Sequence, residues 1–114
     1  MTPSARLKSL ALALVHGDAE SAAALVTDAI VWETIGGGTI RGIAALREAL
    51  AGPLPAQVTS ATVDEAVADE RGGWVRGAIT LKNGRTRAFV DLYEFAEDGS
   101  MRIRRVVSCD IGVA

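Results

Sequence analysis

Two carboxylates lie in stretches of sequence that are otherwise largely apolar. Glu33 falls within Ile-Val-Trp-Glu-Thr-Ile (30–35), and Asp91 falls within Phe-Val-Asp-Leu-Tyr-Glu-Phe (89–95). Because side chains on a strand alternate between its two faces, each acid shares its face with apolar neighbours. A carboxyl group in such surroundings is poorly solvated, which disfavours its charged form. We therefore predict acid–base chemistry, with Glu33 as the proton acceptor and Asp91 as a neutral proton donor.

The same alternation places four further side chains near Asp91. Phe89 and Tyr93 share its face of the strand, and Ser108 and Asp110 share one face of the last strand. We expect these four residues to line the cavity that holds Asp91. The Tyr93 hydroxyl is a possible hydrogen-bond donor to a substrate, and simple packing in the core is the alternative.

Each candidate residue also has an explanation that requires no chemistry. Asp91 could form a salt bridge with Arg87, which lies four residues back on the same face. Glu33 could simply reach water beside the glycine turn that follows it. Trp32 could contact a ligand through its indole N–H, or it could pack in the core or at a dimer interface.

The composition argues against several classes of function. The 114 residues are 49% hydrophobic and 23% charged, which is typical of a folded domain that spans the whole chain, 1–114. The formal net charge of -2 gives no electrostatic reason to expect nucleic acid or an anionic membrane as a partner. The partner that we expect is a small hydrophobic molecule.

The chain offers few residues for metal or redox chemistry. Cys109 is the only cysteine and His16 the only histidine, so most zinc and haem sites and any internal disulfide are excluded. We expect no metal and no organic cofactor. Arg6 and Lys8 interrupt the N-terminal segment, which therefore resembles neither a signal peptide nor a membrane span, and we expect a cytoplasmic protein.

Hydrophobic periodicity and turn residues divide the chain into a helical part and a strand part. The spacing of apolar residues and the capping pair Gly17-Asp18 predict helices over 4–16, 18–27 and 43–51. Alternating apolar residues predict strands over 28–35, 57–69, 73–82, 86–96 and 101–111, and 39–41 is a short return segment. The glycine run 36–38 and the pair Asn83-Gly84 predict hairpin turns.

This order of elements is typical of an α+β domain whose helices pack on one face of a sheet. In the 86–96 strand, however, Val90 and Leu92 make the face opposite Asp91 apolar as well. A strand that is apolar on both faces needs a cover on each. Because the helices supply only one cover, we predict a homodimer that buries the open face of the sheet.

Three segments, taken in order, resemble the nuclear transport factor 2-like superfamily, which includes ketosteroid isomerases and SnoaL-like polyketide cyclases. They are His16-Gly17-Asp18, the first-strand segment 28–33 and the third-helix segment 42–47. The resemblance covers about residues 5–111. It implies a curved antiparallel sheet wrapped around N-terminal helices, which is a cone-shaped, cystatin-like fold with a central apolar pocket.

The resemblance also implies roles for individual positions. Glu33 stands where ketosteroid isomerases carry a general-base aspartate, and Asp91 stands where they hold an aspartic acid neutral so that it donates a hydrogen bond. The family's oxyanion-binding tyrosine on the first helix is replaced by Leu10, and a supporting tyrosine on the third helix is replaced by Leu50, and a leucine donates no hydrogen bond. Both leucines are expected to line the pocket, and Tyr93 is the remaining candidate donor.

We therefore expect a small acid–base enzyme that removes a proton alpha to the carbonyl of a small hydrophobic molecule, followed by isomerisation or ring closure. The alternative is a non-catalytic ligand-binding or dimerisation module on the same fold, in which Leu10, Leu50 and Trp32 fill the pocket. Epoxide hydrolysis would need the Asp–Arg–Asp set of limonene epoxide hydrolase. Phe89 replaces its arginine, two residues before the strand aspartate, so the sequence lacks that motif.

Overall fold

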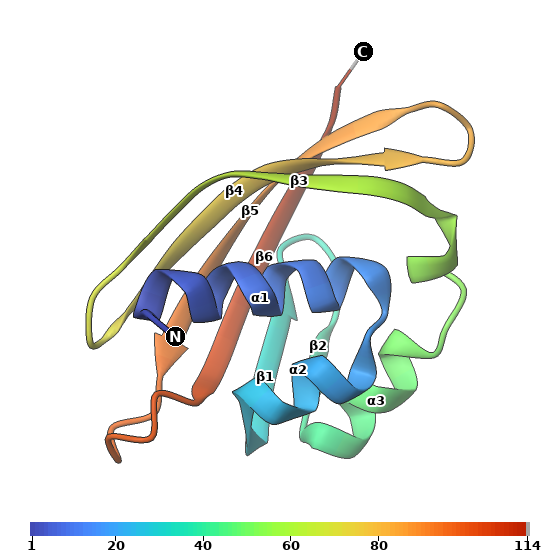
Figure 1. The fold of residues 1–114 in the computed structure, drawn as a ribbon. Helices are drawn as coiled ribbons and strands as arrows, with labels where there is room; N and C mark the ends of the chain where they lie inside the picture. The colour runs from blue at the N-terminus through green and yellow to red at the C-terminus, as the bar shows by residue number, and fades with distance from the viewer. Residues whose placement is uncertain (114) are drawn as a thin grey trace.

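Three α-helices lie on the concave side of one curved, six-stranded sheet in the computed structural model, which describes residues 1–113 (Figure 1). The helices are α1 (Pro3–His16), α2 (Ala19–Leu25) and α3 (Ile43–Leu50), and a short 3-10 helix follows, η1 (Pro55–Gln57). The strands are β1 (Val26–Thr34), β2 (Thr39–Arg41), β3 (Val58–Ala68), β4 (Gly72–Leu81), β5 (Thr86–Phe95) and β6 (Ile103–Val113). The predicted α+β fold is therefore confirmed. Within residues 1–113, no helix is both long and apolar enough to cross a membrane.

The strands follow one another in the order β2-β1-β6-β5-β4-β3. Strands β3 to β6 form an antiparallel meander, as predicted. The Asn-Gly turn joins β4 to β5, with Gly84 at a φ of 83° and the Leu81 N–H donating to the Arg85 carbonyl at 2.9 Å. Strand β1, in contrast, pairs with β6 in parallel, so the sheet is mixed where we predicted antiparallel strands throughout. Turn signals specify hairpins, but they do not specify a pairing between strands so far apart in the chain.

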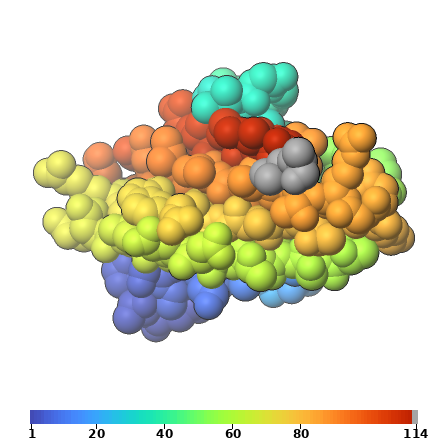
Figure 2. All heavy atoms as spheres, turned by 90° about the horizontal axis from the view of Figure 1, so that it is seen from above, coloured from blue at the N-terminus to red at the C-terminus, as the bar shows by residue number. Residues whose placement is uncertain are grey.

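The convex face of the sheet is free of helices in the part of the chain that the structure describes. Figure 2 looks onto this face, where β3, β4, β5 and β6 lie side by side. Large apolar side chains remain exposed on it, among them Val90 (44%) and Leu92 (52%) of β5. Since the opposite face of β5 is buried against the core, this strand is apolar on both faces, as predicted.

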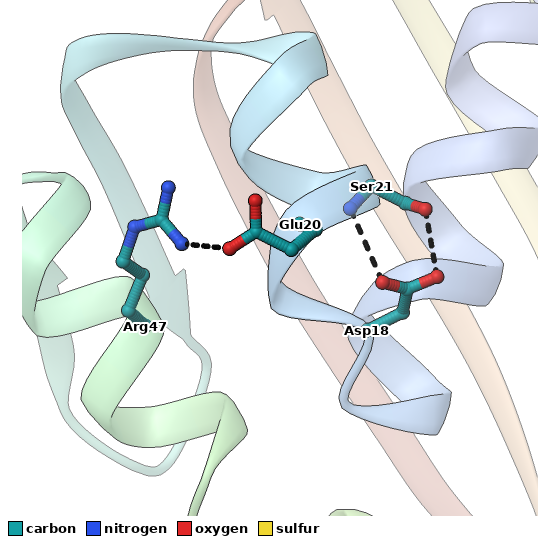
Figure 3. A network of polar contacts seen from close by, with 4 residues as sticks. All are labelled: Asp18, Glu20, Ser21 and Arg47. Carbon is teal, nitrogen blue, oxygen red and sulfur yellow. Dashed lines mark hydrogen bonds and ion pairs between the residues drawn. The ribbon is translucent and has the colours of Figure 1, made fainter.

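The ends of the first two helices follow from their capping residues. Gly17 ends α1 in the left-handed conformation, at a φ of 72°. Asp18 caps α2, where its Oδ1 accepts the Ser21 N–H at 3.2 Å and its Oδ2 accepts the Ser21 hydroxyl at 2.7 Å (Figure 3). Helix α2 ends two residues earlier than predicted, because the β-branched pair Val26-Thr27 begins β1 instead.

An ion pair joins α2 to α3 at the surface. Arg47 Nη1 lies 2.6 Å from Glu20 Oε1, as Figure 3 shows. The two side chains are 45% and 86% exposed, and such a pair contributes only about 0–1 kcal/mol. The position of α3 therefore depends mainly on its buried apolar side chains, Leu46 and Leu50.

The hydrophobic core fills the space between α1 and the sheet. Leu7, Leu10 and Ala11 of α1 are fully buried. They belong to one cluster with buried side chains of the strands, which include Ile30, Val75, Tyr93, Phe95, Ile103 and Val106. Toward the C-terminal end of α1 this packing gives way to a cavity, whose wall on that helix is Leu14 and Val15.

Candidate functional site

A cavity of about 490 Å³ lies between the concave face of the sheet and the segment that runs from the end of α1 through α3 to η1. Pockets of about 300–1,000 Å³ are typical sites for small ligands. The lining is mainly apolar, and its charged and hydrogen-bonding side chains include Trp32, Thr34, Gln57, Arg87, Asp91, Ser108 and Asp110. The cavity can therefore enclose a hydrophobic ring system while it presents a few polar groups.

Asp91 is the buried acid of this cavity. Its residue is only 5% exposed, because strand alternation points it to the concave face together with Phe89 and Tyr93. The Tyr93 hydroxyl donates a hydrogen bond to Asp91 Oδ2 at 2.9 Å. Burial raises the pKa of Asp91, while hydrogen bonds from Ser108 and Tyr93 act in the opposite direction and the Asp110 carboxylate adds to the increase. A carboxyl group in this setting is suited to accept and return a proton.

A chain of hydrogen bonds across three strands orients the Asp91 carboxyl. Ser108 of β6 lies directly opposite Asp91 of β5. Its Oγ accepts the Trp32 indole N–H from β1 at 2.9 Å. A serine hydroxyl that accepts one hydrogen bond can still donate its own hydrogen. Ser108 donates it to Asp91 and so favours the charged form of that carboxyl group. Trp32 therefore acts through a polar contact, and not only as the large apolar residue that its type suggests.

The residues predicted to surround Asp91 divide into two groups. Those that line the cavity are Phe89, Trp32, Leu50, Ser108 and Asp110. Tyr93 (3% exposed) and Leu10 (0%) do not line the cavity but lie in the core behind its wall. The predictions that Leu10 and Tyr93 line the pocket are wrong. On α1 the cavity begins one helical turn after Leu10, at Leu14, and on β5 it ends at Asp91.

Glu33 lies outside the cavity. Its neighbours Trp32 and Thr34 line the cavity, so the alternation of β1 turns Glu33 to the convex face. There its side chain is 41% exposed, and its Oε1 accepts a hydrogen bond from Arg105 Nη2 at 3.1 Å. The prediction that Glu33 and Asp91 meet in one cavity is therefore wrong. The residues that share this face with Glu33 are apolar, and this led to the wrong prediction. They do not bury it, because Ile35 is itself 59% exposed.

Arg87 brings the positive charge of the cavity, and sequence reasoning did not assign it to the site. Its Nε and Nη2 donate to the two carboxylate oxygens of Asp110, each at 3.1 Å. Arg87 thus pairs with Asp110 of β6 rather than with Asp91, which was the expected alternative. Its place on the same strand face as Asp91 was the signal available in the sequence. Among residues 1–113, no group of His, Cys, Asp or Glu side chains is arranged to hold a metal ion.

Phe89 reaches its place in the wall because the opposite strand has a glycine there. Gly77 lies directly across from Phe89 in the β4–β5 pairing. A Cβ atom at Gly77 would lie 3.0 Å from the Phe89 ring and would also clash with the Thr62 carbonyl oxygen. The absent side chain therefore lets the aromatic ring lie close to the sheet, between Arg87 and Asp91 on the same face.

Replacing Tyr93 by phenylalanine is expected to raise the pKa of Asp91 further. The Tyr93 hydroxyl donates to the carboxylate and so favours its charged form, and the substitution removes that donor while it keeps the ring in the core. The titration of the Asp91 carboxyl carbon, followed by NMR, should move to higher pH. Glu33→Gln, on the convex face, should leave it unchanged. An unchanged or lower midpoint in Tyr93→Phe would contradict the assigned hydrogen bond.

Comparisons with known proteins agree with this architecture. A family model described as a SnoaL-like domain matches residues 8–106. An NTF-2 like protein of unknown function from Burkholderia xenovorans LB400 is 18% identical, with a TM-score of 0.80 over 98% of this chain and 84% of that chain. A "putative ketosteroid isomerase" from Kribbella flavida DSM 17836 is 21% identical, with a TM-score of 0.78 over 98% of this chain and 79% of that chain.

A third similar structure is SalBIII, described as an epoxide hydrolase/cyclase-like enzyme in pyran ring formation in the polyether salinomycin. It is 17% identical, with a TM-score of 0.74 over 98% of this chain and 95% of that chain. Among curated proteins, none matches the chain. At these identities, the similar structures establish a shared fold and leave the chemistry to be argued from the site.

Proposed function

The chain belongs to the SnoaL-like domain family of the nuclear transport factor 2-like superfamily, and we propose that it is a proton-transfer enzyme that acts on a small hydrophobic carbonyl compound. Asp91 is the proton-abstracting group. The observation that carries this proposal is its position, since a carboxyl group only 5% exposed forms part of the wall of a mainly apolar cavity. This role replaces the one predicted for Glu33, which lies on the other face of the sheet.

The reaction follows from a single carboxylate beside a bound ketone. Asp91 removes a proton from the carbon alpha to the carbonyl, and the electron pair of the broken C–H bond forms the C=C bond of an enolate. The negative charge moves to the substrate oxygen. Return of the proton at another carbon gives isomerisation, and attack of the enolate carbon on a second carbonyl gives ring closure. General acid–base catalysis of this kind contributes about 10²–10⁴ in rate.

The test is alpha-proton exchange in deuterium oxide, with the bicyclic ketone beta-tetralone as the probe and proton NMR as the measurement. The native protein should exchange the alpha protons faster than buffer does. Glu33→Gln, which removes a carboxylate from the convex face, should match the native protein. Binding of the ketone without exchange would favour the non-catalytic ligand-binding module. If the protein shows no binding of the ketone and no exchange, both functions are ruled out.

Epoxide ring opening is a second candidate function, favoured by one feature of the cavity. The sequence lacks an arginine two residues before Asp91, but Arg87 and Asp110 line the same cavity as that carboxyl. The site therefore contains two aspartates and one arginine, but their spacing in the sequence differs from that of the Asp–Arg–Asp set of limonene epoxide hydrolase. A described epoxide hydrolase/cyclase-like enzyme also shares the fold. Conversion of a styrene oxide probe to its diol, measured for the native protein and for an Asp91→Asn variant, would distinguish this chemistry from proton exchange.

The convex face of the sheet has the features of an interface. Val67, Trp74, Leu92 and Val107 are successive partners across β3, β4, β5 and β6, and they form one apolar row. Leu92 and Val67 are 52% and 46% exposed. An apolar centre of this kind on a surface typically marks a contact site.

We further propose that a second copy of the chain covers this apolar row. On one side of the row, Arg76 Nε lies 3.2 Å from Glu65 Oε1, and on the other side Arg104 Nε lies 3.4 Å from Glu94 Oε2. A two-fold axis brings the same patch against itself, so a rim with both signs of charge is complementary to its own copy. The partner is therefore expected to be identical rather than strongly acidic or basic.

Light scattering after size-exclusion chromatography should give the mass of a dimer for the native protein. Leu92→Glu places a charge at the centre of the apolar row and should give a monomer, because the charge would be buried without a partner. Circular dichroism should show that the variant keeps its secondary structure. A monomeric native protein, or a Leu92→Glu variant that stays dimeric, would contradict an interface on this face.

A further inference from the structure

We propose that Arg87 binds the substrate oxygen on which negative charge develops, and that Asp110 holds the guanidinium in place for this contact. The proposal deepens the proton-transfer function above and rests on it. Leu10 and Leu50 cannot donate a hydrogen bond to that oxygen, and the proposal assigns this role to Arg87, a side chain of the cavity wall.

The hydrogen bonds of Arg87 leave donors free for a ligand. Its Nε and one N–H of Nη2 bind the two oxygens of Asp110. A guanidinium group has five N–H donors, so three remain, two of them on Nη1. Within residues 1–113 these donors have no further hydrogen-bond partner, and the Arg87 side chain, 39% exposed, lines the cavity. The free N–H groups of the guanidinium can therefore bind an oxygen atom of a ligand while Nε and Nη2 remain bound to Asp110.

The strand register brings the guanidinium of Arg87 toward the carboxyl group of Asp91. Arg87, Phe89 and Asp91 share one face of β5, and Asp110 lies directly opposite Phe89, between the other two. Because Arg87 reaches across to Asp110, its guanidinium leans toward Asp91. Two residues of strand span about 7 Å. That distance suits a carbonyl unit whose carbon contacts Asp91 and whose oxygen contacts Arg87, with the substrate ring above Phe89.

Charge movement during the reaction favours the same arrangement. Before the transfer, the cavity wall holds two carboxylates, Asp91 and Asp110, and one cation, Arg87. Proton abstraction neutralises Asp91 and places the negative charge on the substrate oxygen. The total charge is unchanged, but the negative charge has moved toward the guanidinium, where it is stabilised. The two carboxylates also repel a ligand that is already anionic, so the substrate class is a neutral cyclic ketone.

The test uses naphthol, whose ionised form resembles an enolate, and an Asp91→Asn background, which resembles the protonated base. Absorbance measures how much of the bound naphthol is ionised at fixed pH. Adding Arg87→Met to this background should weaken naphtholate binding by about tenfold to a hundredfold, the range expected for the loss of a hydrogen bond to a charged group. Binding of uncharged naphthalene should stay within about twofold, because the apolar wall is intact.

Arg105→Met is the matched control. Arg105 also donates to a carboxylate at 3.1 Å, but its partner is Glu33 on the convex face. This substitution should leave naphtholate binding unchanged. Asp110→Asn should weaken naphtholate binding less than Arg87→Met does, because the asparagine oxygen still accepts one of the two hydrogen bonds that hold the guanidinium in place.

Two different failures can be distinguished by these measurements. If the Asp91→Asn protein does not bind naphthol, and the native protein exchanges no alpha protons of beta-tetralone, the proposed function itself fails. If the Asp91→Asn protein binds naphthol and the native protein exchanges the alpha protons, but Arg87→Met and Arg105→Met bind naphtholate equally well, only the role of Arg87 is overturned.

Discussion

Replacing Asp91 by asparagine is expected to slow alpha-proton exchange of beta-tetralone by about 10²–10⁴-fold. Asparagine keeps the shape of the side chain and can still accept the Tyr93 hydrogen bond through its carbonyl oxygen, but it cannot take up a proton. The measurement is the rate of deuterium incorporation, followed by NMR. Glu33→Gln is the matched control and should exchange at the native rate. A residual rate in Asp91→Asn close to native would contradict Asp91 as the base.

The same substitution should not destabilise the protein at neutral pH. Burial raises the pKa of Asp91 in the folded state above its value in the unfolded chain. The folded protein therefore binds this proton more tightly than the unfolded chain does, which adds to the free energy of unfolding. The added stability is fully present below the pKa of the unfolded chain and is lost as the pH rises through the raised pKa of the folded state. Asparagine never bears the charge, so the variant should gain stability relative to native as the pH increases. Thermal unfolding at a series of pH values measures this difference, and a variant that loses stability at neutral pH would show that the carboxylate is a structural support.

Leu10→Ala is expected to lower the free energy of unfolding by about 2–5 kcal/mol. Leu10 is fully buried in the cluster between α1 and the sheet, so the truncation leaves a cavity in tightly packed surroundings. Denaturant unfolding measures the loss. Naphthol affinity should stay close to native, because Leu10 does not line the ligand cavity.

Leu50→Ala provides the comparison for this variant. Leu50 is also buried, at 4% exposed, but its side chain forms part of the cavity wall. Its truncation enlarges an existing space, and we expect a smaller loss of stability together with a changed affinity for naphthol. If the two variants change naphthol affinity equally, Leu10 belongs to the functional cavity after all.

Most of the fold could be predicted because its determinants are local. Gly17 and Asp18 mark the end of one helix and the beginning of the next, and Asn83-Gly84 marks a hairpin. Each signal depends on backbone conformation or on hydrogen bonds over a few residues. The parallel pairing of β1 with β6 has no such signal, because it joins segments that are distant in the chain.

The candidate site was predicted only where strand alternation was sufficient. Asp91 was placed correctly on the face of Phe89 and Tyr93, since that face is the more aromatic one of β5. Glu33 was misplaced because both faces of β1 carry apolar residues, and alternation does not say which face turns inward. Arg87 was recognised as a neighbour of Asp91 on its strand, but its contact with Asp110 depends on the register between two strands.

The order of residues by itself determined the helices, the hairpins, the two apolar faces of the central strand and the presence of an acid among aromatic side chains. These properties depend on the period of each element and on its nearest neighbours in the chain. Only the tertiary structure decided that Asp91 lies beside a cavity with Arg87 and Asp110, while Glu33 lies on the opposite surface. The direction in which a sheet curves and the register of its strands result from packing among all the elements together, and no single segment encodes them.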